Sequence, residues 1–399
     1  MLSMGGMATF PAVMPALRDD WSLSNVDAGW ISSSFHGGYM LFVPLLAALS
    51  DRIDAKRILL ASIAVSASSS AAFAWLATGL PTAIMLQAAG GAALAGIYMP
   101  GLKGLADRIA GPLQGRYISF YTASFTVGTS VSFLLAGAAT RAWGWRAAFA
   151  AAALGQAAAF ALVALGLPKA QAVRDGAAQD SPMESPAGLL TGRIRARFMP
   201  VAASREAMDF IWGYAAHMWE LFALRAWLVP FLAFSLADRA PEGAWAAPAL
   251  AAFVTLLGVP ASIVGQEAAS RIGARRLIVG AMLVAAAASL VVGWLSSAPV
   301  WLVVAGCSLY SVAISADSAP LTAAAMAAAP AGRRGATMAV HSTLGFTAAA
   351  LGTLAVGATL DAFGGESHAA WGFAFAVMGL TSLPGAWRVG RRRTATAGV

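Results

Sequence analysis

The sequence predicts an all-α integral membrane protein, with twelve transmembrane helices arranged as two pseudo-symmetric six-helix bundles. Of its 399 residues, 59% are hydrophobic and only 11% are charged, whereas about a quarter are charged in an ordinary soluble domain. Long apolar runs recur along the chain, and each approaches the ~20 residues that a helix needs to cross a bilayer. Short matches between the two halves of the chain indicate that one six-helix unit has been duplicated.

The apolar runs give the order of the expected spans. They are continuously apolar, whereas the strands of a membrane barrel alternate over ~10 residues, so helices are predicted. In the first bundle, residues 1–166, we expect spans at 1–17, 28–50, 58–78, 82–104, 117–140 and 146–166. In the second bundle, residues 207–390, we expect them at 209–236, 246–265, 277–296, 300–325, 336–360 and 371–388, followed by a tail at 391–399.

The first span is shorter than the others. Counted from Met1 it reaches only ~25 Å, whereas the apolar core of a bilayer measures ~30 Å. We therefore expect the native chain to begin upstream of Met1. The amino terminus also lacks the basic segment of a cleaved signal peptide, so the first span is expected to be retained.

The segment between spans 6 and 7, residues 167–206, differs in composition from the rest. It is polar and rich in Pro, Ser and Gly, which breaks any long helix, so we expect a linker between the bundles. The basic stretch "GRIRARF" at 192–198 fits either a strip lying on anionic lipid headgroups or a solvated loop.

The basic residues predict the orientation and exclude other classes of protein. Most of the 26 Lys and Arg residues lie in the linker, in the tail and after even-numbered spans, so both termini and the linker should be cytoplasmic. Because they form short clusters rather than one basic stripe, nucleic-acid binding is not expected. The single cysteine, Cys307, excludes an intrachain disulfide and a cysteine-based metal site.

Three pairs of segments carry the internal repeat. They are "SDRIDAKR" (50–57) with "ASRIGARR" (269–276), "LAGAATRAWG" (135–144) with "AVGATLDAFG" (355–364), and "WRAAFAAAAL" (145–154) with "WGFAFAVMGL" (371–380). The pairs occur in the same order at offsets of 219 to 226 residues, which indicates a duplicated bundle. Membrane proteins built from such repeats place a cavity near the midplane and alternate its access by rocking one half against the other.

Over essentially its whole length, the chain resembles members of the major facilitator superfamily. The family's motif after span 2 is represented by Ala47, Asp51, Arg52, Asp54, Lys56 and Arg57, with Ala47 and Asp54 in place of two glycines. The resemblance implies a cytoplasmic gate in which a carboxylate attracts arginines and a helix N-terminus, favouring the outward-facing state. The alternative is an ordinary basic loop that serves topology. Gate candidates are Asp51, Arg52, Lys56 and Arg57, and in the second copy Glu267, Arg271, Arg275 and Arg276, where Ser270 replaces the aspartate.

Two departures from the family pattern weigh against multidrug efflux. Gln87 stands where many proton-coupled members carry an arginine in span 4. Span 5 contains Gly128 and Gly137 but no proline, whereas drug-proton antiporters of the family commonly hold a Gly-Pro pair there.

The stretch "HMWELFALRAW", residues 217–227, places three ionisable residues inside span 7. A charge at the centre of a lipid-facing helix costs at least ~3 kcal/mol, so Arg225 should face the protein interior or a cavity. Because arginine keeps its proton, it needs an anionic partner. Glu220, Asp317 on span 10 and an anionic substrate all remain open as that partner. His217 lies between Glu220 and Arg225 around the helix.

Other polar residues are candidates for substrate binding or coupling. Asp317 is either a proton-coupling carboxylate or a structural partner of Arg225, and Pro320 is expected to bend its helix. His36 and His341 titrate in the useful pH range but also suit structural hydrogen bonds. Tyr121 is the repeat equivalent of His341, and Tyr39 suits either the cavity wall or aromatic packing.

The sequence contains no nucleotide-binding loop, zinc-binding motif or hydrolase elbow. We therefore predict neither an enzyme nor a cofactor, but a secondary transporter driven by an ion or solute gradient. The expected substrate is a small organic or inorganic anion, moved by proton coupling or exchange. Open alternatives are a drug or metabolite efflux proton antiporter, and a non-transporting membrane receptor or assembly protein. The resemblance implies a bacterial cytoplasmic (inner) membrane and a monomer.

Overall fold

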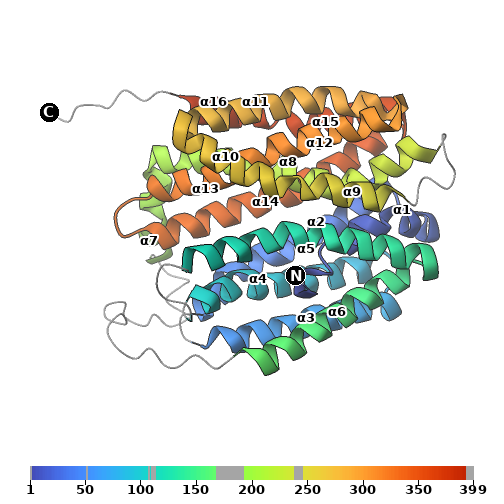
Figure 1. Cartoon of the computed structure of the whole chain (residues 1–399), viewed down its shortest axis with the longest axis horizontal. Helices are drawn as coiled ribbons and strands as arrows, with labels where there is room; N and C mark the ends of the chain where they lie inside the picture. The colour runs from blue at the N-terminus through green and yellow to red at the C-terminus, as the bar shows by residue number, and fades with distance from the viewer. Residues whose placement is uncertain are drawn as a thin grey trace.

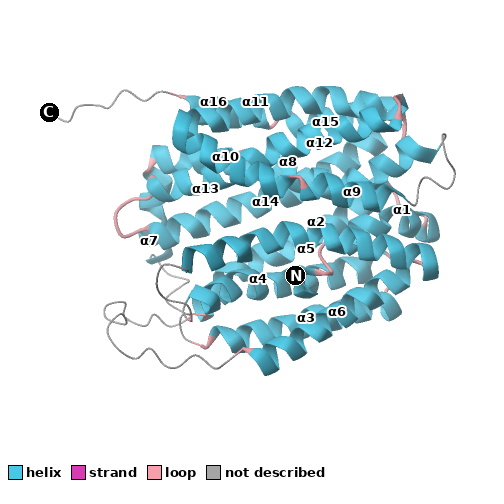
Figure 2. Ribbon diagram, viewed as in Figure 1, coloured by secondary structure: helices cyan, strands magenta, loops and turns pink. Residues whose placement is uncertain are grey.

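The computed structural model of the protein describes residues 2–50, 53–106, 108, 114–167, 193–237 and 246–391. Within these ranges every regular element is a helix, as Figure 2 shows. In Figure 1 the helices of the first half, blue to green, lie below those of the second half, yellow to red.

The first half consists of α1 to α6. A short 3-10 turn, η1 (Leu2–Met4), precedes them. The helices are α1 (Thr9–Trp21), α2 (Asn25–Leu49), α3 (Ala55–Leu76), α4 (Leu80–Ala106), α5 (Gln114–Trp143) and α6 (Trp145–Gly166).

The second half begins with α7 (Arg193–Ala203) and α8 (Arg205–Ala237). Three of its membrane segments are interrupted pairs, and a fourth ends in a 3-10 turn. In chain order the remaining elements are α9 (Ala247–Leu256) with α10 (Gly258–Ile272), α11 (Ala274–Val292) with η4 (Gly293–Ser297), α12 (Val300–Ala316) with α13 (Ser318–Ala327), α14 (Arg334–Ala362), and α15 (His368–Gly379) with α16 (Ser382–Gly390).

The prediction of an all-α membrane protein is confirmed. Within the described residues, ten helical segments are long and apolar enough to cross a membrane. The two expected spans outside this set are α1, which has only 13 residues, and α2, whose first half carries a run of serines and His36.

Several boundaries differ from the sequence prediction, and one of the larger shifts is at the end of span 8, which reaches Ile272 rather than 265. The first helix begins at Thr9 rather than at residue 1, because Gly5 and Gly6 lie in a turn before it, and it extends to Trp21. The end of the predicted linker is helical, since α7 covers Arg193–Ala203. Residues 168–192 of the linker lie outside the described residues, as do the side chains of 193–197.

Proline positions explain the interrupted pairs of the second half. A proline has no N–H to bond the carbonyl four residues earlier, and its ring clashes with that carbonyl. Each break falls three residues before a proline, at Leu257 before Pro260, Asp317 before Pro320 and Thr381 before Pro384. The expected bend at Pro320 is therefore an interruption of the helix at Asp317.

Within the described residues, the two halves meet chiefly where α2 packs on α14, α5 on α9 and α10, and α1 on α8. We call the end where α6 stops and α7 starts the linker end, at the left in Figure 1, and the opposite end the outer end. Small residues allow close approach at the outer end. A Cβ on Gly137 of α5 would lie 2.5 Å from the Pro248 side chain of α9, so this crossing requires a glycine.

Candidate functional site

Arg225 of α8 lines a cavity between the two halves. The cavity holds ≈ 440 Å³ of space, counting its open part, and its other walls come from α1, α2, α4 and α5 of the first half. Its polar lining residues besides Arg225 are Ser32, His36, Gln87 and Thr129. Phe10, Phe35, Phe133 and Phe222 are among the apolar ones. The cavity therefore combines one fixed cation with largely apolar walls.

The guanidinium of Arg225 has no acidic partner among the described residues. None of the cavity's lining residues is acidic, and the buried Nη1 atom makes no hydrogen bond. The Phe125 and Phe222 rings lie 5.9 Å and 5.6 Å from the guanidinium carbon, which provides a weak cation–π attraction. The positive charge thus faces the first half without a counter-charge.

Glu220 and His217 point away from Arg225, into the interior of the second half. The Glu220 carboxylate accepts a hydrogen bond from the Tyr310 hydroxyl at 3.1 Å and another from the Ser382 hydroxyl. His217 Nδ1 lies 2.8 Å from Asp317 Oδ1, which is ion-pair distance, although neither atom makes a hydrogen bond of ordinary geometry. Both internal carboxylates therefore have partners other than Arg225.

The break between α12 and α13 positions Asp317. This residue ends α12 and precedes the first turn of α13, so its side chain leaves the chain at the interruption and meets α8. His217 is 1% exposed and Asp317 2%. The pair is enclosed in protein, and neither residue lines the cavity of Arg225.

Of the histidines and tyrosines predicted from the sequence, only His36 lines the cavity. Its ring contacts the Phe222 ring edge-on at 4.6 Å, and its Nδ1 has no hydrogen-bond partner. His341 stacks on Tyr214 at 3.6 Å inside the second half. The Tyr121 hydroxyl lies 3.0 Å from the carbonyl oxygens of both Ile97 and Tyr98 of α4. The structure therefore brings His36 and Arg225 together and leaves His341 and Tyr121 elsewhere.

Tyr39 belongs to an apolar cluster that joins both halves on the linker side of the cavity. Its ring stacks on Phe346 of α14 at 3.9 Å, and it follows His36 by about one turn of α2. We call this cluster the aromatic plug. Its members include Tyr39, Val43, Leu94, Met218, Phe222 and Phe346, with Tyr98, Phe125 and Tyr214 packed against them. Along α2 and α8, Tyr39, Val43 and Met218 lie on the linker side of the cavity-lining residues His36 and Phe222.

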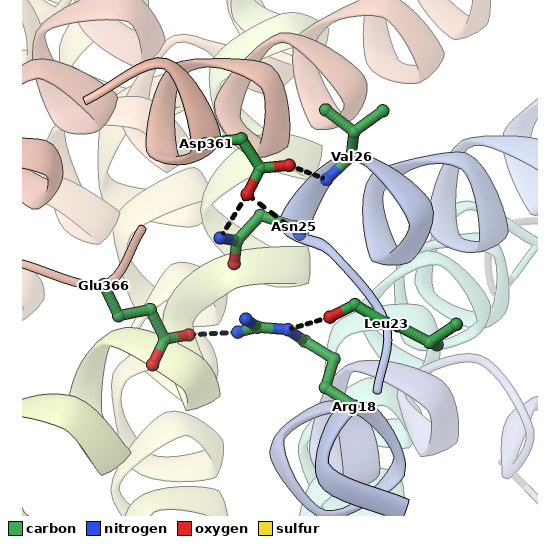
Figure 3. A network of polar contacts seen from close by, with 6 residues as sticks. All are labelled: Arg18, Leu23, Asn25, Val26, Asp361 and Glu366. Atoms are coloured by element: carbon green, nitrogen blue, oxygen red, sulfur yellow. Dashed lines mark hydrogen bonds and ion pairs between the residues drawn. The ribbon is translucent and has the colours of Figure 1, made fainter. Parts of the chain in front are cut away.

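A polar network joins the halves at the outer end, as Figure 3 shows. Asp361 at the end of α14 accepts hydrogen bonds from the backbone N–H groups of Asn25 (3.1 Å) and Val26 (2.8 Å), and from the Asn25 side chain (2.7 Å). These backbone groups belong to the first turn of α2, which leaves them without partners inside the helix and attracts a negative charge. Arg18 at the end of α1 pairs with Glu366. We call these five residues the outer clasp.

Glycine and serine bring α2 and α14 into close contact below the clasp. A Cβ on Gly357 would lie 2.4 Å from the Asn25 carbonyl oxygen, and one on Gly29 would lie 3.3 Å from the Leu354 Cα. The Ser33 hydroxyl donates to the Ala350 carbonyl at 2.6 Å. The outer end is therefore closed by backbone contact as well as by charge.

Sequence reasoning did not identify the outer clasp. Asp361 appears in the repeat as the residue aligned with Arg141, and this opposite charge at equivalent positions was the available signal. A second signal was the segment from Ser24 to Asp27, where each side chain accepts the other's backbone N–H, as in a capping box. It marked the start of α2 but gave no indication of a partner from the other half.

The gate candidates at the linker end make contacts within their own halves. Asp51 and Arg52 lie outside the described residues. Lys56 donates to the carbonyls of Ala164 (2.9 Å) and Leu167 at the end of α6. Asp54 caps α3 and pairs with Arg108 at 2.9 Å. Among the described residues of the motif after span 2, Asp54 is therefore the carboxylate that contacts an arginine.

In the second half, Glu267 pairs with Arg271 one turn later, and Arg275 pairs with Glu206 of α8, both at 2.7 Å. Arg57 and Arg276 are exposed. These contacts leave the linker-end gate as a prediction, because each of them joins elements of the same half.

Comparisons with known proteins agree with this architecture. The sequence profile described as Major Facilitator Superfamily matches residues 1–353. A search of curated proteins finds no match. Among solved structures, a bacterial homolog of the human lysosomal transporter Spinster, in an inward-facing and unoccupied conformation, has a TM-score of 0.75 at 15% identity, covering 98% of this chain and 93% of that one.

Two further structures are similar. The xylose transporter XylE from E. coli, in a partially occluded inward-open conformation, has a TM-score of 0.71 at 14% identity over 97% of this chain and 94% of its own. The nucleoside transporter NupG has a TM-score of 0.66 at 16% identity over 97% and 96%. At these identities the similarity establishes the fold. Together with the profile match it confirms the resemblance seen in the sequence: the chain is a multi-pass membrane protein that belongs to the Major Facilitator Superfamily.

Proposed function

We propose that the protein is a secondary active transporter of a small organic anion, with Arg225 as the residue that binds the anionic group. One observation carries the proposal: the guanidinium lines a cavity that both halves form, and its buried Nη1 has no partner. An unpaired charge in such a place costs free energy, which an anionic ligand would recover. A carboxylate suits this role because guanidinium binds it through two parallel hydrogen bonds.

The composition of the cavity favours an organic monoanion over an inorganic oxyanion. It offers one cation, a few neutral polar groups and several phenylalanine rings. Apolar walls with a few polar groups suit a ligand with a carbon skeleton. A multiply charged ion would lose its strongly bound hydration shell on entering the cavity. Among its described lining residues, the cavity offers no second cation to offset that loss.

Alternating access accounts for the arrangement around this cavity. The outer clasp closes one end, and the aromatic plug lies between the cavity and the linker end. By the distribution of basic residues the linker end is cytoplasmic. In this conformation the cavity is therefore closed toward the outside, and a substrate that leaves toward the cytoplasm has to pass the aromatic plug. The inward-facing descriptions of the Spinster homolog and XylE structures support this assignment.

We assign proton coupling to the His217–Asp317 pair. The two side chains are in contact and enclosed, and neither is needed to neutralise Arg225. A histidine–carboxylate pair changes its net charge when one proton is gained or lost, which links its surroundings to the proton gradient. Glu220 is held by Tyr310 and Ser382, which favours a supporting role beside this pair.

Ligand-induced stabilisation of the purified full chain tests the proposal. The melting temperature would be measured against a panel of monocarboxylates, sugars, amino acids and cationic drugs, because a true ligand raises it by mass action. We expect a monocarboxylate to raise it in the wild type, and Arg225→Ala and Arg225→Lys to abolish the rise, since lysine lacks the two-pronged geometry. Arg141→Ala, which removes an exposed arginine that belongs neither to the cavity nor to the predicted gate, is the matched control.

Either of two results would contradict the assignment of Arg225. One is an acid whose stabilising effect is unchanged in Arg225→Ala. The other is a cationic drug as the best ligand of the panel, which would favour the efflux alternative.

A further inference from the structure

A second cavity adjoins the first one inside the first half. It lies among η1, α2, α3, α4 and α6. Met7, Phe35 and Gln87 line both cavities, so the two are neighbouring compartments on either side of these residues. We call the second one the inner compartment.

The inner compartment is polar but uncharged. Its polar lining residues are Ser3, Ser66, Ser69, Ser70, Gln87 and Gln156, and none of its lining residues carries a charge. It therefore suits neither a second acidic group nor an amine. Its other walls include the stacked rings of Phe73 and Phe149, with centroids 3.9 Å apart.

Gln156 of α6 presents an unused acceptor at this place. Its side chain is 1% exposed, and its Oε1 atom accepts no hydrogen bond. A buried acceptor without a donor costs free energy, and a ligand hydroxyl or N–H would remove that cost. Ser69, in contrast, already donates to the Leu86 carbonyl at 2.5 Å. The lining atom that still needs a hydrogen-bond donor is thus Gln156 Oε1.

We propose that the anion bound by Arg225 extends past Met7 and Phe35 into the inner compartment. The substrate class is then a monocarboxylate whose far end carries neutral hydrogen-bonding groups, such as the hydroxyls of a polyhydroxylated acid. The carboxylate pairs with Arg225, a hydroxyl donates to Gln156, and the ring faces pack against C–H groups. This inference rests on the proposed function, because it takes Arg225 as the anchor of the ligand.

Gly6 offers a way to fill the inner compartment without touching Arg225. A Cβ at this position would lie 2.6 Å from Gln156 Nε2 and 3.2 Å from the Ser70 hydroxyl oxygen. Gly6 does not line the cavity of Arg225 and does not have a positive φ. Gly6→Ala therefore displaces Gln156, and Gln156→Leu removes the acceptor with little change in volume.

Binding of two matched six-carbon acids tests the inference. Gluconate and hexanoate carry the same carboxylate, but only gluconate has hydroxyls; glucitol has hydroxyls and no charge. Isothermal titration of the purified full chain in lipid nanodiscs would compare the three in the wild type, Gly6→Ala, Gln156→Leu and Arg225→Gln. We expect gluconate to bind about tenfold more tightly than hexanoate, which corresponds to one well-made hydrogen bond.

Gly6→Ala and Gln156→Leu should each remove that tenfold advantage while changing hexanoate binding less than twofold. Arg225→Gln should abolish the binding of both acids. Equal affinities of the two acids in the wild type, or an equal loss of both in the two compartment variants, would show that the compartment holds only water and would overturn the inference alone. Failure of both acids to bind, or glucitol binding that persists in Arg225→Gln, would overturn the anchoring by Arg225 and the proposed function with it.

Discussion

Arg225 and Asp317 show how far residue-level reasoning reaches. The cost of a membrane-buried charge predicts that Arg225 faces a cavity or a carboxylate, and the cavity does contain it. The partner of Asp317 was not predictable, because residues 217 and 317 meet only through the packing of α8 against the break after α12. Gln156 was also missed, since an amide in an alanine-rich helix has no sequence pattern that marks an unused acceptor.

Replacement of Asp317 separates coupling from binding. Asp317→Asn keeps the shape of the side chain but cannot lose a proton, so exchange of labelled substrate should stay within about threefold of the wild type while accumulation driven by a proton gradient is lost. Both activities would be measured in proteoliposomes. Ser315→Ala changes a residue on α12 two positions before Asp317 and leaves the carboxylate intact, so it serves as the control. Equal loss of exchange and accumulation would mean that the pair with His217 is structural.

At the scale of elements, the apolar runs predicted the membrane helices to within a few residues at most ends. A span is dictated by the hydrophobic thickness of the bilayer, which acts on each helix separately. Contacts between helices of different halves do not recur at regular intervals along the sequence. The outer clasp on the first turn of α2 therefore has no sequence pattern comparable to an apolar run. Asp361 caps a helix from which it is separated by more than 300 residues.

Removal of this cap should favour opening of the outer end. Loss of a helix N-cap costs about 1 kcal/mol, which corresponds to about a fivefold change in population. In Asp361→Ala, a cysteine placed at Ser33, which is 5% exposed here, should react about fivefold faster with a membrane-impermeant maleimide added from outside. Cys307 is buried and is replaced by alanine in all samples.

Asp20→Ala is the matched control for this measurement, because it removes an exposed carboxylate at the outer end whose contacts with Trp145 and Arg146 lie within its own half. An unchanged labelling rate in Asp361→Ala would mean that the clasp does not hold the outer end closed.

At the scale of the whole molecule, closure depends on backbone contact between α2 and α14. Gly357→Leu would place a side chain where a Cβ alone meets the Asn25 carbonyl oxygen at 2.4 Å. We expect this variant to insert and fold but to remain open outside, with transport reduced at least tenfold. Spin labels at Trp143 and Trp301, which are exposed near the outer ends of different halves, would report a longer distance than in the wild type.

Gly335→Leu is the control for that variant, because nothing lies within 4 Å of a Cβ at Gly335 of the same helix. Distances that match those of the wild type in Gly357→Leu would show that the two helices separate elsewhere.

The interruptions before Pro260, Pro320 and Pro384 distinguish the second half from the first. In the first half, Pro15, Pro44 and Pro100 lie inside helices that continue without a break. Each interruption leaves carbonyl groups without their helical partners, so α9–α10, α12–α13 and α15–α16 can bend at one point with little loss of hydrogen bonding. Within the described residues, the helix breaks that precede a proline thus lie in the second half, and Asp317 lies at one of them. If Asp317 binds the coupling proton, as we propose, that proton arrives at the point where α12 and α13 meet, so the charge change falls where the helix is already interrupted.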